Sequence, residues 1–143
     1  MLRTLLTLAL GVTVGLSGLA LARQDDKGTP KRNVIAARDI AEKLDGKDAK
    51  VTCIEVTLAP GQSSNPHRHP GPVFGYVLEG EYEHAIDDQP AHVLKVGETF
   101  YEPTGCLHRV ARNPGQKGNT RVLAVLVHPR DAKQISVPEP KKD

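Results

Sequence analysis

The feature that most constrains the fold is a series of short β-type runs, each ended by turn residues. The runs are rich in Val, Ile, Leu and Thr, and Gly, Pro, Asn or Asp lies between them. Many short strands at regular spacing are typical of a sandwich or barrel, so we expect an all-β fold. Only residues 35–44 read as a helix, and the pattern there is weak. The expected strands cover residues 50–58, 73–78, 81–86, 91–96, 99–101, 107–111 and 120–127.

The two ends of the chain read differently from its middle. Residues 1–22 combine a basic Arg3, an apolar run and the ending Ala20-Leu21-Ala22, which together predict a secretory signal peptide. An uncleaved membrane anchor is the alternative, but glycines weaken the apolar run, so we expect no stable anchor. We therefore expect a periplasmic or secreted protein, with a flexible leader at 23–32, a β-barrel at 33–130 and a C-terminal tail at 131–143, flexible from Pro138 onward.

Charge and composition exclude some classes of partner. The formal net charge is only +2 and aromatic residues make up 3% of the chain. Neither a strong positive field nor a stacking platform for bases is present, so we expect no nucleic acid partner and favour a small-molecule ligand or substrate. Export permits a disulfide between Cys53 and Cys106, but free thiols, buried or half-buried, are the favoured alternative.

Three histidines have a spacing that suits a metal ion. His67 and His69 are two apart, so in a strand both side chains point to one face. His108 follows a turn made by Pro103 and Gly105 and supplies a third imidazole. Neutral imidazoles suit Fe, Cu, Zn or Ni and leave coordination positions open. The plain alternative is that these histidines are surface polarity, since a short His-x-His pattern is common.

The glycines and prolines around these histidines resemble the two motifs of the cupin superfamily. The resemblance covers about residues 34–128 and implies a double-stranded β-helix, a jelly-roll-like barrel with a divalent transition metal inside near one mouth. The family also pairs through strand edges, so we expect a homodimer. The matching positions are Gly61, His67, His69 and Gly80 in the first motif, and Gly97, Pro103, Gly105 and His108 in the second; Asn113 falls one residue late.

One ligand of the family pattern is missing. Val73 stands where the family usually has a metal-binding Glu. The site is then either three-histidine or completed by another group, for which Gln62 and Tyr101 are candidates. Loss of a carboxylate should disfavour hard ions such as Mn and favour Zn, Cu or Fe. Three other acids belong to the next turn and strand, and we do not expect them to reach the metal: Glu79, Glu81 and Glu83.

The resemblance implies two functions of different kinds. The first is a metal-dependent oxygenase, dioxygenase-like as in quercetinase-like cupins, acting on a small oxygenated compound. Loss of the usual Glu argues against a flavonol-type mechanism and leaves the catalytic residue unknown; His84 and Glu102 are candidate bases, but a surface or packed structural role is the favoured interpretation of His84. The alternative is a non-catalytic small-molecule or metal-binding cupin that serves as a sensor or carrier. His92 and His128 are expected to face solvent, and Arg68 and Arg109 to point outward.

Overall fold

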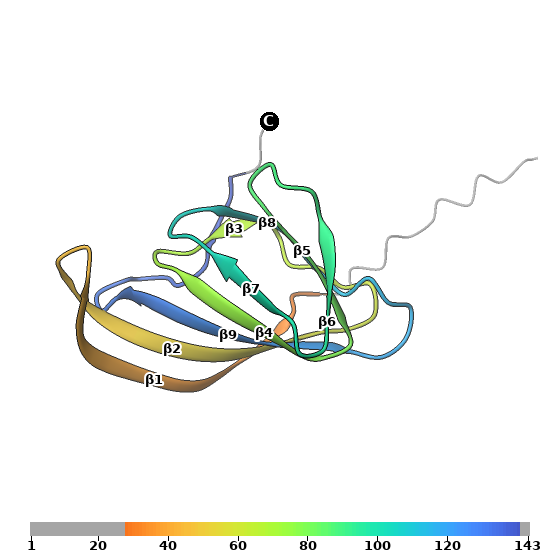
Figure 1. Cartoon of the computed structure of the whole chain (residues 1–143), viewed down its shortest axis with the longest axis horizontal. Helices are drawn as coiled ribbons and strands as arrows, with labels where there is room; N and C mark the ends of the chain where they lie inside the picture. The colour runs from red at the N-terminus through yellow and green to blue at the C-terminus, as the bar shows by residue number, and fades with distance from the viewer. Residues whose placement is uncertain (1–27, 141–143) are drawn as a thin grey trace, which may run out of the picture.

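The computed structural model describes residues 28–140, and it consists of two five-stranded antiparallel sheets that face each other (Figure 1). One sheet has the order β1-β2-β9-β4-β7 and the other the order β10-β3-β8-β5-β6. The all-β, jelly-roll expectation is confirmed. The strands are β1 (Lys31–Leu44), β2 (Lys47–Leu58), β3 (His67–Arg68), β4 (Val73–Glu79), β5 (Glu81–Ile86), β6 (His92–Lys95), β7 (Thr99–Glu102), β8 (Leu107–Arg112), β9 (Thr120–Pro129) and β10 (Val137–Pro138).

Alternation along the strands builds the core between the sheets. In β4, Val73 and Val77 are buried, whereas Phe74 and Tyr76 are exposed on the outer face. Burying one face of each sheet fixes the register, because a shift by one residue would turn every apolar side chain outward. With few aromatic residues, aliphatic side chains fill most of the interior. The buried cluster comprises Ile54, Leu58, Val73, Val77, Tyr82, Leu94, Phe100, Ala111, Val122 and Leu126.

The expected helix at residues 35–44 is wrong. These residues lie in β1, which pairs with β2 as a long antiparallel hairpin at the edge of the first sheet. Asp45 and Gly46 connect the two strands, and both have positive φ, 49° and 76°. Two successive residues with positive φ suit a tight hairpin turn, for which Asp-Gly is a favoured pair. The turn therefore decides the structure of both flanking segments.

The chain on either side of the barrel core is also partly paired. Lys31 and Arg32, within the expected flexible leader at 23–32, pair with Thr57 and Val56 of β2. At the other end, within the expected tail at 131–143, β10 pairs with β3, and the Glu139 backbone N–H donates to the Pro66 carbonyl. Flexibility from Pro138 onward is therefore not what the structure has at residues 138 and 139. Residues 1–22, predicted as a signal peptide, lie outside the described residues, and no helix within residues 28–140 is long and apolar enough to cross a membrane.

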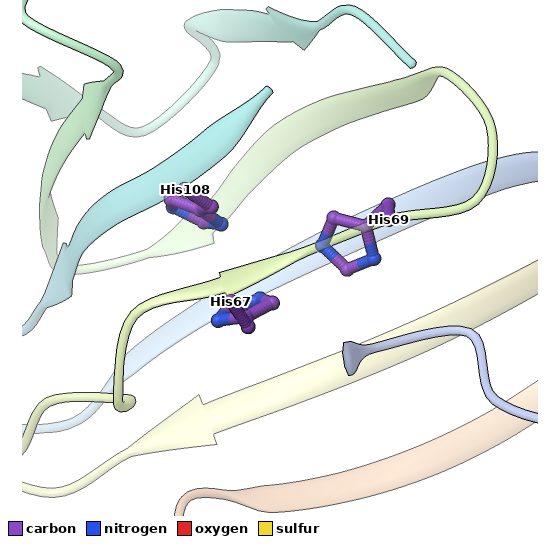
Figure 2. Close-up of side chains that lie close together, drawn as sticks. All are labelled: His67, His69 and His108. Carbon is purple, nitrogen blue, oxygen red and sulfur yellow. The ribbon is translucent and has the colours of Figure 1, made fainter. Parts of the chain in front are cut away.

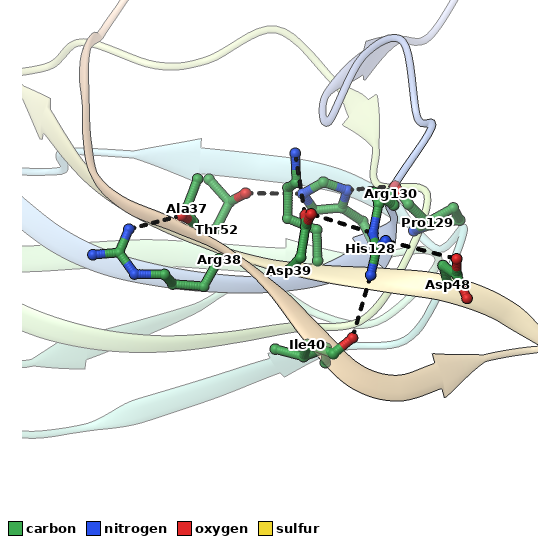
Figure 3. Close-up of polar contacts among 10 residues, drawn as sticks. Ala37, Arg38, Asp39, Ile40, Asp48, Thr52, His128, Pro129 and Arg130 are labelled. Carbon is green, nitrogen blue, oxygen red and sulfur yellow. Dashed lines mark hydrogen bonds and ion pairs between the residues drawn. The ribbon is translucent and has the colours of Figure 1, made fainter.

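His128 does not face solvent as expected. It lies on β9 at a position that alternation directs inward, and only 4% of it is exposed. Its Nε2 atom lies 2.9 Å from the Thr52 hydroxyl, and its Nδ1 atom lies 2.9 Å from the Pro129 carbonyl oxygen (Figure 3). Nearby, Arg130 contacts Asp39 of β1 and Asp48 of β2, which ties the hairpin to the end of β9. His128 is therefore a structural residue of the hairpin region.

Candidate metal centre

A small cavity lies between the two sheets. Its volume is about 170 Å³, and most of its wall is aliphatic, with Ile54, Val56 and Leu126 among the lining residues. Three histidines and one carboxylate also line it: His67, His69, His108 and Glu102. Ligand pockets for drug-sized molecules are larger, roughly 300–1,000 Å³. The cavity therefore suits a small ligand.

The structure brings His67, His69 and His108 together (Figure 2). His67 on β3 is the direct antiparallel partner of His108 on β8, so both side chains lie on the same face of the second sheet. His69 follows β3 and, two residues after His67, points the same way. The ring centroid of His67 lies 4.8 Å from that of His69 and 4.9 Å from that of His108. One nitrogen of each ring lies within 4.8 Å of the others.

Glu102 brings a carboxylate into this group from the opposite sheet. It is 1% exposed, and its Oε1 atom lies 3.1 Å from His108 Nδ1. Its Oε2 atom lies 3.5 Å from His69 Nε2. On β7, Glu102 is the direct antiparallel partner of Val73 on β4. The carboxylate therefore stands beside the position at which the family motif has its Glu, on the neighbouring strand.

Backbone carbonyls orient two of the imidazoles. His67 Nδ1 lies 2.8 Å from the Asn65 carbonyl oxygen, and His69 Nδ1 contacts the Ile135 carbonyl oxygen. A ring that donates Nδ1–H to a carbonyl keeps its Nε2 lone pair for a metal. The residues after β9 thus take part in the site, and an ion pair between Arg68 and Glu139, 2.8 Å between Nε and Oε2, holds them against β3. Arg68 points away from the histidines, as alternation predicts.

Burial decides the protonation of the cluster. It lowers the pKa of His108 to about 3, and it also lowers that of His67, so both rings are neutral near pH 7. Burial raises the pKa of the Tyr82 hydroxyl well above its ordinary value, and the Glu102 charge raises it further. For Glu102, burial acts to raise the pKa, but the interactions with His84, His108 and His69 together outweigh it and lower the pKa. The site thus contains neutral imidazoles and an ionised carboxylate.

The donor set fits a divalent cation. Among the described residues, four buried polar atoms have no hydrogen-bond partner: both ring nitrogens of His84, Oε2 of Glu102 and Nδ1 of His108. Buried polar atoms are nearly always paired, so these need a partner. Two ligand atoms about 2.1 Å from one tetrahedral ion lie roughly 3.4 Å apart, close to the contacts of Glu102 with the histidines. A cation bound between Glu102 and the histidines would give Glu102 Oε2 and His108 Nδ1 a partner.

The other candidate residues do not line the cavity. Gln62 and Tyr101 are wrong as possible ligands, because the Gln62 side chain bonds to the backbone of Ala59 and Gly28, and Tyr101 is 52% exposed. His84 is 2% exposed and does not line the cavity, but its Nε2 atom lies 3.4 Å from Glu102 Oε1, and His84, Glu102 and His108 form a second group whose ligand atoms lie within 4.8 Å of one another. His92 is exposed.

Both cysteines are free in the structure, the alternative that the sequence favoured. Cys53 is half-buried on β2, whereas Cys106 is buried two residues before His108. Burial raises the pKa of the Cys106 thiol to about 11, so this thiol is protonated near neutral pH. A protonated thiol is a poor metal ligand.

The metal-free protein is expected to lose stability in acid. Unfolded His titrates near pH 6.5, whereas buried His108 titrates at about 3, so the unfolded state binds more protons between these values. Each such group lowers the free energy of unfolding by up to about 1.4 kcal/mol per pH unit as the pH falls from about 6.5. Below the ordinary Glu pKa, Glu102 acts in the same direction. Urea denaturation of the metal-free chain from about pH 7 to pH 5 measures how the free energy of unfolding changes with pH. This dependence should flatten in His108→Gln and persist in His92→Gln. The same pH dependence in wild type and both variants would contradict the prediction.

Comparisons with known proteins give the family and the fold. The model of the family Cupin_2, described as "Cupin domain", matches residues 54–126, about half of the chain. The oxalate oxidase GF-2.8 of Triticum aestivum is 30% identical over 96 residues, which are 62% of this chain and 43% of the wheat protein. An oxalate oxidase of Hordeum vulgare matches equally well. The chain thus spans less than half the length of the curated relatives it matches.

Two solved structures share the fold. A conserved double-stranded β-helix protein from Klebsiella pneumoniae has a TM-score of 0.59 at 24% identity, over 78% of this chain and 87% of that chain. The DMSP lyase DddQ from Ruegeria pomeroyi has a TM-score of 0.58 at 20% identity, over 79% of this chain and 54% of that chain. At these identities the likeness concerns the fold. Together with the family match, it shows that the chain belongs to the cupin superfamily and that the matching stretch is a small cupin domain.

Proposed function

We propose that this cupin binds one divalent transition metal through His67, His69, His108 and Glu102. The observation that carries the proposal is that these four groups, three of them buried and His69 half-buried, line one cavity from both sheets. The expectation that hard ions are disfavoured rested on the absence of a carboxylate. Glu102 removes that reason, so three imidazoles and one carboxylate suit Mn as well as Fe, Cu, Zn or Ni.

We propose further that the metal serves an oxidase or oxygenase acting on a small oxygenated compound. A bound metal would supply Lewis acidity and, as Fe, Cu or Mn, redox chemistry. The small volume of the cavity, about 170 Å³, favours a small substrate. The relatives named as oxalate oxidases support a reaction on a small oxygen-rich molecule.

The side chains of the site divide the remaining work. Tyr82 keeps its proton, and its hydroxyl lies 3.3 Å from His108 Nε2, at the cavity wall, where it can donate a hydrogen bond. Glu102 contributes a negative charge that offsets the charge of the metal. His84 Nε2 lies 3.4 Å from Glu102 Oε1 without a hydrogen bond, so we assign His84 an electrostatic role beside the carboxylate.

Localisation and assembly are proposals from the sequence. The first 22 residues support export to the periplasm or the medium. In the described part of the chain, β1 forms an edge of its sheet, and an exposed strand edge supports a homodimer.

Elemental analysis combined with oxygen uptake tests the proposal. Wild-type protein should retain about one metal ion, and His67→Ala should bind it at least about tenfold more weakly, whereas His92→Ala, which alters an exposed histidine, should match wild type. Equal metal content in wild type and His67→Ala would contradict the site. Oxygen consumption with small hydroxy acids, dicarboxylates, diketones, catechols or flavonols supports the enzyme. Ligand binding without turnover would support the non-catalytic sensor or carrier instead.

A further inference from the structure

The metal-site cavity opens toward a second, outer depression. The outer depression has a volume of about 320 Å³ and is lined by residues of the β2–β3 loop, the segment before β1 and the segment around β10. Four residues line both spaces and therefore stand between them. These are Arg32, Ser64, His67 and Ser136, which we call the neck.

Arg32 is unusual among the arginines of the described chain. It lies on β1 opposite Val56, which lines the same cavity, so its side chain is on the concave side of the sheet. Every other arginine in residues 28–140 makes a hydrogen bond or an ion pair: Arg38, Arg68, Arg109, Arg112, Arg121 and Arg130. Arg32 has no such partner among the described residues. A solvent-exposed guanidinium with no partner among the described residues thus stands at the rim that the two spaces share.

The surroundings of Arg32 favour an anion. Glu102 is the one acid among the described residues that line either space, and it lines only the inner cavity and not the outer depression. Ser64 and Ser136 add hydroxyl groups beside Arg32. Guanidinium and hydroxyl donors match the planar acceptor geometry of a carboxylate, and charge-assisted hydrogen bonds of this kind are strong.

We propose that Arg32 determines substrate class, by holding the carboxylate of a short organic acid at the neck while an oxygen at the other end of the acid meets the His67–His69–His108 site. This inference rests on the proposed metal function and gives it a substrate class. The small inner cavity limits the acid to a few carbons. Most of the inner cavity surface is apolar, which disfavours ligands that carry further charged groups.

Calorimetric titration of the metal-loaded full chain tests the proposal. The probes are unbranched dicarboxylates of increasing length, from oxalate upward, and their uncharged diamides. One length should bind best, and Arg32→Gln should weaken its binding at least about tenfold while leaving diamide binding and metal content unchanged. Arg32→Lys should fall between wild type and Arg32→Gln, because it keeps the charge but loses the planar donor pair. The matched control is Arg38→Gln, which alters an exposed arginine on the same strand.

The outcomes separate this inference from the proposed function. Equal dicarboxylate binding by wild type and Arg32→Gln, or no binding of any acid, overturns the role of Arg32 whatever the metal content. Equal weakening of dicarboxylate and diamide binding also overturns it, because the effect would then not depend on charge. Loss of metal from wild type in the same samples would instead overturn the proposed metal function.

Discussion

Replacing Glu102 by Val is expected to weaken metal binding about a hundredfold, and adding Val73→Glu to the same chain should restore most of the lost affinity. Among the described residues, Glu102 is the one carboxylate that lines the cavity with the three histidines, and a hundredfold loss of affinity corresponds to about 2.7 kcal/mol. Val73 is its direct partner across β4 and β7, is 1% exposed and lines the same cavity. Directly opposed residues have Cβ atoms about 5 Å apart, so a Glu at 73 can direct its carboxylate to the same space.

The metal affinities of wild type, Glu102→Val and the double variant, measured by competition with a chelator, check this prediction. The matched control is Glu83→Gln, which removes a carboxylate that pairs with Arg112 on the outside of the barrel and should leave the affinity unchanged. Wild-type affinity in Glu102→Val would show that the histidines suffice. No recovery in the double variant would show that the position of the carboxylate, as well as its presence in the cavity, is essential.

Gly75→Ala is expected to destabilise the protein by about 1–3 kcal/mol, although Ala is only one methyl larger. Gly75 is the direct partner of Phe100 across β4 and β7, and a Cβ atom at 75 would lie 1.9 Å from Phe100 Cζ. The Phe100 ring has little freedom to move, since its centroid lies 4.7 Å from that of His84 and 5.3 Å from that of Tyr82. The free energy of unfolding in urea measures the effect.

A double-mutant cycle isolates the cause. Leu lacks the distal ring atoms of Phe100, so Gly75→Ala should cost much less in a Phe100→Leu background than in wild type. Additive effects of the two changes would mean that the Cβ atom at 75 does not act through the ring. A loss below about 0.5 kcal/mol in Gly75→Ala alone would also contradict the prediction.

Much of the fold could be predicted from the sequence because strand alternation and turn residues are local signals. The runs at 73–78 and 81–86 match β4 and β5 closely. The helix expected at residues 35–44 is wrong because the weak pattern of that segment outweighs, in a local interpretation, the Asp45-Gly46 hairpin turn that follows it. The inward direction of His128 cannot be predicted locally, because it depends on β9 continuing to Pro129 by pairing with β2.

The candidate site also contains residues that local sequence patterns predict and residues that they do not. His67 and His69 are two apart in the chain and His108 belongs to a recognisable turn, so spacing was enough to group them. The sequence suggests Glu102 as a candidate base but does not place its carboxylate beside the three imidazoles, because its position next to Val73 depends on the pairing of β4 with β7. One signal was available: Phe100 and Glu102 alternate on the same face, and a carboxylate on the apolar face of a strand needs a partner. The Ile135 carbonyl gave no signal in the sequence at all.

The contact of His69 with Ile135 has a consequence for how the protein is made. The two residues are 66 positions apart, and Arg68 and Glu139 are 71 apart. Because the chain emerges from the ribosome in order, a nascent polypeptide that has reached His108 holds all three imidazoles but lacks the carbonyl that orients one of them. A proposed metal site oriented by Ile135 would then form only after the segment that includes β9 has been made, and clipping between Arg130 and Ile135 would leave β9 in its sheet but remove the carbonyl that orients His69.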